Sequence, residues 1–155
     1  MQPQHIRAAL PQDSQLLTAL ALRSKAYWGY SQEFMVACRQ ELSQSREKIS
    51  TPKFHFFVCE IAETITGFYA LEQLSPTKFE LEALFVEPDW MGQGIGRLLM
   101  EHAKAKALCL GGQLLYIYAD PNAAGFYQAM GGILTGTQES ASVPGRFLPI
   151  YILKL

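Results

Sequence analysis

One segment, residues 79–100, constrains the fold of this chain more than any other, because it joins an apolar strand to a glycine-rich turn and then to a helix. Residues 81–86 form the apolar strand, and Gly92, Gly94 and Gly96 then remove side chains that would keep a ligand away from the backbone. A helix that begins near Gly94 leaves its first amide groups without internal acceptors and with partial positive charge. The segment therefore predicts a strand-to-helix junction suited to binding phosphate.

Two common nucleotide-binding loops do not fit this spacing. The dinucleotide fingerprint GxGxxG needs a glycine at Arg97 when counted from Gly92, or at Leu99 when counted from Gly94. The P-loop pattern GxxxxGK[ST] fails as well, because the sequence contains no Gly-Lys-Ser/Thr triplet. The turn is therefore either a phosphate-binding loop of another kind or an ordinary tight turn between a strand and a helix.

A second strand-to-helix junction narrows the choice. The apolar strand LLYIY at 114–118 is followed by DPNAAGFYQAMGG at 120–132. The order of GQGIGR at 92–97 and then N-A-x-x-F-Y-x-x-x-G at 122–131 resembles the GNAT superfamily of acetyl-CoA-dependent N-acetyltransferases. The resemblance extends over nearly the whole chain, and it is specific over 79–132.

The resemblance implies a site for coenzyme A on the glycine loop and between two parallel strands that splay apart. The family loop is usually Gln/Arg-x-x-Gly-x-Gly/Ala, and this chain has Met91 at its first position, which implies a weaker loop and not a lost one. A pantetheine arm is expected along the exposed strand edge at 84–86. The implied cofactor-binding residues are Leu84, Phe85, Val86, Met91, Gly92, Gln93, Gly94, Ile95, Gly96, Arg97, Asn122, Phe126 and Tyr127.

Length and composition predict one domain over residues 1–155. A chain of 155 residues, 49% of them hydrophobic and 17% charged, buries one sizeable core and leaves no room for a second domain of ordinary size. The expected class is α/β (α+β). The resemblance implies the order βααβββαβαββ, with a mixed, mostly antiparallel twisted sheet that is splayed between two parallel strands and flanked by helices.

The residue pattern places these elements along the chain. Strands are expected at 5–9, 54–62, 65–74, 79–86, 114–119, 133–137 and 148–154. Helices are expected at about 14–26, at about 31–44, from Gly94 to the glycine pair at 111–112, and at about 122–130. The polar segment 43–53 is expected to be a loop.

Charge and cysteine content exclude several classes of partner. A net charge of −1 gives no global field that recruits nucleic acid or anionic lipid. The three cysteines, Cys38, Cys59 and Cys109, have no CxxC spacing and are expected to be reduced core residues. The sequence has no signal-peptide pattern and no run of about 18 apolar residues, and its histidines lack metal-ligand spacing. We therefore expect a cytoplasmic protein without metal, nucleic acid or membrane partners.

Amide formation requires a base, because an alkyl amine with a pKa of about 10.4 is mostly ammonium at neutral pH. Glu80 and Glu82 stand two residues apart on the predicted strand, so both carboxylates lie on one face. Either takes the proton, directly or through a water, or both are solvated strand residues without a role. Between the two, the sequence-based choice is Glu82. A backbone N–H near Val86 would stabilise the oxyanion formed by attack on the thioester.

The resemblance also implies a general acid and a contact to the cofactor arm. Tyr127 matches the tyrosine that protonates the departing thiolate in the family; the alternative is a tyrosine ring packed on the core with its hydroxyl in solvent. Asn122 matches a residue that bonds to the cofactor arm, and its side chain can also cap the helix that follows.

The acceptor site is the least specified. In the family the first two helices and the last hairpin line it, so Tyr27, Trp28 and Tyr30 are candidates for an aromatic wall or are core residues. Arg146 either meets a carboxylate of the acceptor or closes a surface turn. The expected acceptor is a small-molecule or peptide amine, and pairing into a homodimer is a further expectation from the resemblance. The alternatives to an N-acetyltransferase are a non-catalytic acyl-CoA sensor and an interaction module of the same fold.

Overall fold

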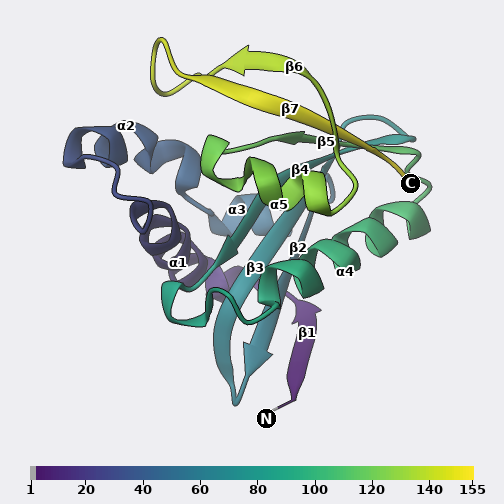
Figure 1. Ribbon diagram of the computed structural model, residues 1–155. Coiled ribbons are helices and arrows are strands. Elements are labelled where there is room, and N and C mark those ends of the chain that lie inside the picture. The colour runs from purple at the N-terminus through teal and green to yellow at the C-terminus, as the bar shows by residue number, and fades with distance from the viewer. Residues whose placement is uncertain (1–2) are drawn as a thin grey trace.

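The structure, a computed structural model, describes residues 3–155 and contains a seven-stranded sheet in the order β1-β2-β3-β4-β5-β7-β6 (Figure 1). The strands are β1 Gln4–Ala8, β2 Phe54–Ile61, β3 Thr64–Gln73, β4 Lys78–Val86, β5 Leu114–Tyr118, β6 Ile133–Glu139 and β7 Phe147–Lys154. The helices are α1 Ser14–Ala26, α2 Gln32–Leu42, α3 Arg46–Ser50, α4 Ile95–Cys109 and α5 Ala124–Ala129. Short 3-10 turns lie at Pro11–Asp13, Pro88–Trp90 and Pro121–Ala123.

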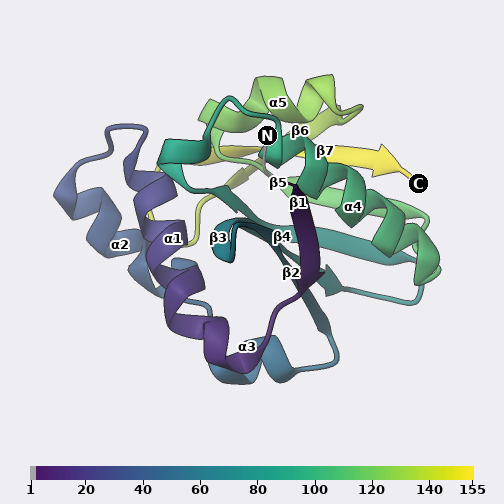
Figure 2. The ribbon, with the colours of Figure 1, turned by 90° about the horizontal axis from the view of Figure 1, so that it is seen from below.

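Every neighbouring strand pair in this sheet is antiparallel except β4 and β5, which are parallel. Helices cover both faces, with α1 to α3 on one side and α4 and α5 on the other (Figure 2). The expected mixed, mostly antiparallel sheet with flanking helices is confirmed. No helix among residues 3–155 has the length and apolar character that crossing a membrane requires.

The two faces of the sheet carry separate hydrophobic cores, because side chains alternate along each strand. The core beneath α1 and α2 includes Leu17, Leu20, Cys38, Phe56, Val58, Phe68 and Ala83. The core beneath α4 and α5 includes Tyr69, Phe79, Leu81, Leu99, Ala103, Leu115, Tyr127 and Tyr151. At Gly67, a Cβ atom would stand 2.9 Å from a methyl group of Leu99, so the absence of a side chain there allows α4 to lie against β3.

Two sequence-based expectations are wrong. The segment expected as a loop contains the five-residue helix α3, which begins where Ser45 accepts a hydrogen bond from the Lys48 amide at 3.1 Å. Cys109, expected in the core, is exposed at the end of α4, whereas Cys38 and Cys59 are buried as expected. Because α3 is short and polar, the sequence pattern did not indicate a helix there. This helix brings Lys48 to the face of β4.

The pairing between β4 and β5 is short, and this creates the opening in the sheet. Only three positions of β4, residues 78–80, pair with β5, at residues 114–116. Beyond Glu80, β4 continues alongside β3 as far as Val86, while β5 continues alongside β7 as far as Tyr118. The carboxyl halves of the two parallel strands are therefore unpaired with each other, which confirms the expected splay.

Candidate active site

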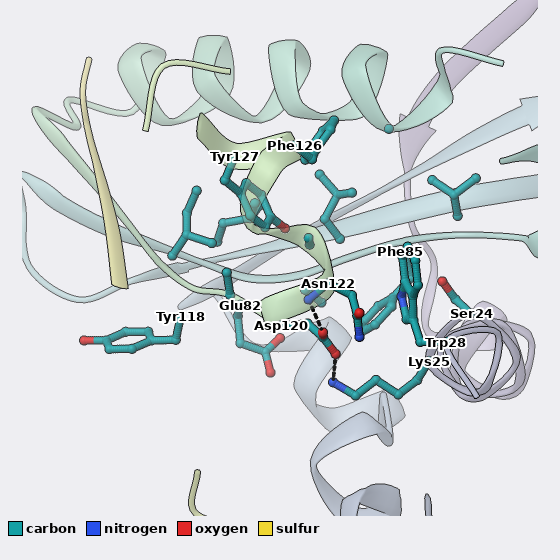
Figure 3. A pocket seen from close by; sticks show the side chains of 18 of the residues that line it. Ser24, Lys25, Trp28, Glu82, Phe85, Tyr118, Asp120, Asn122, Phe126 and Tyr127 are labelled. Atoms are coloured by element: carbon teal, nitrogen blue, oxygen red, sulfur yellow. Dashed lines mark hydrogen bonds and ion pairs between the residues drawn. The ribbon is translucent and has the colours of Figure 1, made fainter. Parts of the chain in front are cut away.

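A cavity of about 760 Å³ occupies the opening between β4 and β5. Its walls come from α1, the end of α2, β4, the glycine loop, the first turn of α4, the end of β5, the β5–α5 connection, α5 and the start of β7. Figure 3 shows Glu82, Tyr127 and Asn122 around this space, with Lys25 reaching Asp120. Segments far apart in the sequence therefore meet at one place.

The glycine loop presents a row of free backbone amides to this cavity. The first hydrogen bond of α4 runs from the Leu98 amide to the Gly94 carbonyl at 3.0 Å, and within the described part of the chain the amides of residues 92–97 donate to no protein acceptor. Gly92 and Gly94 have φ of 77° and 86°, a left-handed conformation that strains other residues. These amides and the positive end of α4 fit a diphosphate.

The free edge of β4 adds backbone groups to the same cavity. The Glu87 amide donates to the Thr66 carbonyl at 2.8 Å, so the backbone polar groups of this residue point towards β3. Because N–H and C=O directions alternate along a strand, those of Leu84 and Val86 point towards the opening and those of Phe85 point towards β3. The edge therefore offers two residues, not three, to an extended ligand.

The structure places most of the predicted cofactor residues around the cavity. Those that line it are Leu84, Phe85, Val86, Met91, Gly92, Gly94, Ile95, Gly96, Arg97, Asn122, Phe126 and Tyr127. Gln93 does not line it, and its side-chain amide donates to the Asp89 carbonyl at 3.4 Å. The helical cap expected of Asn122 is supplied instead by Asp120, whose carboxylate accepts the Asn122 amide at 2.8 Å.

The two predicted candidates for the base both line the cavity but differ in their surroundings. One carboxylate oxygen of Glu82 accepts a hydrogen bond from Lys48 Nζ at 2.6 Å, and its other oxygen is buried without a partner among residues 3–155. Glu80 has no ion pair in that same part of the chain. Burial, reinforced by the nearby charges of Glu72 and Glu82, raises the pKa of Glu80 to about 7. Glu80 therefore accepts and releases protons near neutral pH.

Tyr127 lies in the wall of the cavity on α5, with its ring held by other aromatic rings. The ring centre is 5.2 Å from that of Phe126 and 6.4 Å from that of Tyr151. Burial, with a smaller contribution from the charge of Asp120, raises the pKa of Tyr127. The phenol therefore keeps its proton at neutral pH and is able to donate it.

Beside Asn122 lies a polar cluster that the sequence did not predict as a unit. Lys25 Nζ donates to Asp120 Oδ2 at 2.6 Å, and Arg146 Nη2 donates to the same oxygen at 3.2 Å. The Tyr30 hydroxyl is 2.9 Å from both oxygens of Asp120 and accepts a hydrogen bond from Asn122 Nδ2 at 2.9 Å. Burial alone would raise the pKa of Asp120, but the contacts with Lys25, the Asn122 amide and the Tyr30 hydroxyl together outweigh it and lower that pKa.

The predicted acceptor residues are only partly brought to the cavity. Trp28 and Arg146 line it, and Tyr30 reaches it through Asp120. Tyr27 does not line it, and 57% of its surface is exposed. Arg146 is not a surface arginine, because its side chain is 14% exposed and turned towards Asp120. Lys25 and Asp120 were missed, since a single lysine or aspartate carries no spacing signal. No group of three potential metal ligands occurs in the described chain.

Comparisons with known proteins agree with this geometry. A family model described as the acetyltransferase (GNAT) domain matches residues 52–131, which is just over half of the chain. Over 61 residues, the chain is 44% identical to the peptidyl-lysine N-acetyltransferase YjaB of Salmonella typhimurium. That match covers 38% of this chain and 39% of the relative, so the chain spans about two fifths of that relative's length.

Solved structures match over nearly the full length. The PaiA N-acetyltransferase of Thermoplasma acidophilum, crystallised in complex with coenzyme A, is 23% identical, with a TM-score of 0.81 and coverage of 99% of both chains. The ribosomal-protein-S18-alanine N-acetyltransferase of Escherichia coli is 15% identical, with a TM-score of 0.74 and coverage of 98% of this chain and 94% of that one. These similarities establish the fold.

Proposed function

We propose that this chain, which belongs to the acetyltransferase (GNAT) domain family, transfers the acetyl group of acetyl-CoA to a primary amine of an acceptor molecule. The observation that supports this most strongly is that one cavity is lined by Gly92 and residues 94–97, whose amides are free, by the open edge of β4, and by Glu80 and Tyr127. Diphosphate-binding groups and proton-transfer groups thus share one space, as direct transfer between two bound molecules requires.

The residues of the cavity fit coenzyme A. The amides of residues 92–97 and the N-terminus of α4 would hold its diphosphate, with Arg97 nearby, and the edge groups of Leu84 and Val86 would hold the pantetheine amides. Met91 contributes an apolar side chain, and most of the binding is assigned to backbone. When bound, acetyl-CoA supplies an acetyl thioester whose C–S bond is replaced by the C–N bond of the amide product.

Within this proposal Glu80 is the base, in place of the sequence-based choice of Glu82. The Glu82 carboxylate is neutralised by Lys48, whereas Glu80 titrates near neutral pH. An ammonium acceptor loses two protons on becoming an amide. Glu80 accepts the first of these protons and passes it to solvent. Tyr127 donates its own proton to the leaving sulfur and is then reprotonated by the second proton of the amine.

Binding of coenzyme A tests the site directly. Coenzyme A at ~100 times its Kd is expected to stabilise the folded chain by about 2.7 kcal/mol in thermal or chemical unfolding. Gly94→Val is expected to weaken that binding ~10-fold or more, because a β-branched residue resists φ of 86° and displaces the amides. Gly111→Val is the matched control, because Gly111 has φ of 94° at the far end of α4.

The binding experiment also separates the alternatives. A folded chain that coenzyme A does not stabilise contradicts the proposed function and supports an interaction module. Stabilisation without acetyl transfer to any amine supports an acyl-CoA sensor. The acceptor, the cytoplasmic location and the homodimeric state expected from the sequence stay predictions.

Lys48→Met tests the assignment of the base through the pH dependence of kcat/KM. The charge of Lys48 lowers the pKa of Glu80 and neutralises Glu82, so its loss is expected to raise the pKa of Glu80 above about 7. The acid limb of the profile should move to higher pH, with a rate ~3-fold or more lower at pH 6.5 and little changed at pH 9. Lys154→Met, on the exposed end of β7, is the control. An unshifted limb contradicts the assignment.

A further inference from the structure

The cavity wall next to Asn122 contains two buried cations that share a single carboxylate. Lys25 comes from α1 and Arg146 from the turn before β7, and their side chains are 10% and 14% exposed. Both pair with Asp120 Oδ2 and both line the cavity. The three side chains together carry one excess positive charge.

Arg146 has donor groups that this cluster does not use. Among residues 3–155, only its Nη2 atom finds acceptors, Asp120 and the Tyr30 hydroxyl, both at 3.2 Å. Its Nε and Nη1 atoms have no acceptor within the described residues, although the guanidinium is held 5.0 Å from the ring centre of Phe34. Nε and Nη1 lie on different edges of the guanidinium, so each is a separate donor that is free to bind an anion.

Asp120 is not able to receive a further cation. Its Oδ1 accepts the Asn122 amide at 2.8 Å and lies 2.9 Å from the Tyr30 hydroxyl, while its Oδ2 accepts Lys25 and Arg146. Each oxygen of this carboxylate therefore has at least two partners. The unused binding capacity of the cluster consists of donors and positive charge, which favour an anion.

Other acidic groups of the cavity do not cancel this charge. Glu82 is paired with Lys48, and Glu80 has a pKa of about 7. Glu41 lines the cavity but is exposed, and its carboxylate accepts the Ser142 hydroxyl at 2.6 Å. Because an unpaired buried cation is costly, an anionic ligand group at Arg146 and Lys25 would be stabilised.

From this arrangement, and resting on the proposed acetyl transfer, we infer that the acceptor is a small zwitterion of the amino-acid type. Its primary amine lies at Glu80, and its carboxylate accepts a hydrogen bond from a free N–H of Arg146 with Lys25 beside it. The carboxylate is unchanged by the reaction, in which the amine nitrogen forms the amide bond and loses two protons. Polyamines, which lack an anion, would be repelled by this wall.

The test compares each protein amino acid that has a primary α-amine with its carboxamide, which keeps the amine and side chain and removes the negative charge. Release of coenzyme A is followed with a thiol reagent. For the preferred amino acid, kcat/KM is expected to exceed that of its amide ~100-fold, because the site is built to bind the missing group. Arg146→Met should raise the KM for the amino acid and leave the kcat/KM of the amide within ~3-fold of its original value. The variant should therefore lose most of the preference for the acid over the amide.

Two further variants keep the result interpretable. Arg146→Lys retains the charge but loses the planar guanidinium that lies against Phe34, and it should recover only part of the discrimination. Arg39→Met replaces an exposed arginine of α2, and it should change the kcat/KM of neither the acid nor the amide. Equal turnover of acids and amides, or turnover of internal peptide lysines in preference to free amino acids, overturns the inference and leaves the transferase proposal intact.

A chain that binds acetyl-CoA in calorimetry but acetylates no amino acid also overturns the inference. A folded chain that does not bind acetyl-CoA overturns the proposed function itself. The two failures are therefore distinguished by one binding measurement that does not depend on turnover.

Discussion

Tyr127→Phe is expected to lower kcat by ~100-fold or more while leaving the affinity for acetyl-CoA nearly unchanged. The substitution removes only the hydroxyl, and the contacts of the ring with Phe126 and Tyr151 remain. Within residues 3–155 that hydroxyl has no hydrogen-bond partner, so its loss leaves no buried group unsatisfied. What is lost is the proton donor, which burial keeps protonated by raising the pKa of Tyr127.

Single-turnover measurements with saturating acetyl-CoA and acceptor are the appropriate readout, because slow product release would otherwise hide a chemical defect. Tyr151→Phe is the matched control, since Tyr151 is a buried neighbour in the same core but does not line the cavity. A normal rate for Tyr127→Phe, with Tyr151→Phe also normal, would exclude Tyr127 as the acid and return it to a packing role.

The parts of this molecule that the sequence predicted are those with local signals. Alternating apolar residues gave the strands, and the positions of Gly92 and Gly94 gave the turn into α4, where both have the left-handed φ that favours glycine. The resemblance gave the parallel pair β4 and β5 and the opening between them. Each of these signals lies within a short window of the chain, where spacing is sufficient.

The parts that the sequence did not predict depend on contacts between distant residues. Lys25 meets Asp120 across 95 positions, and Arg146 meets Tyr30 across 116. No spacing rule relates such residues, so the sequence favoured a surface turn for Arg146. The proposal departs from the sequence-based choice of Glu82 for a similar reason. Lys48, which pairs with Glu82, is 34 positions away from it and lies on a helix too short and polar to be recognised.

The assignment of the base gives the other large expected effect. Glu80→Gln should lower kcat/KM at pH 7 by ~100-fold or more, because glutamine has nearly the same shape and does not accept the proton of the amine. The limb of the pH profile near pH 7, which reflects the pKa of Glu80, should disappear. The pH profile of the Glu82→Gln variant should keep an acid limb, because Glu80 is still present as the base.

Stability measurements distinguish this loss of chemistry from damage to the fold. Burial raises the pKa of Glu80 to about 7 from an ordinary value of 4.5, so the folded state binds this proton more tightly than the unfolded state does. The resulting stabilisation is present below pH 4.5 and is lost as the pH rises through about 7. At pH 8 the Glu80→Gln variant, which has a neutral side chain there, should therefore unfold at a temperature equal to or higher than that of the unsubstituted protein. A less active but equally stable Glu80→Gln supports the assignment, whereas a profile that loses its limb only in Glu82→Gln would make Glu82 the base.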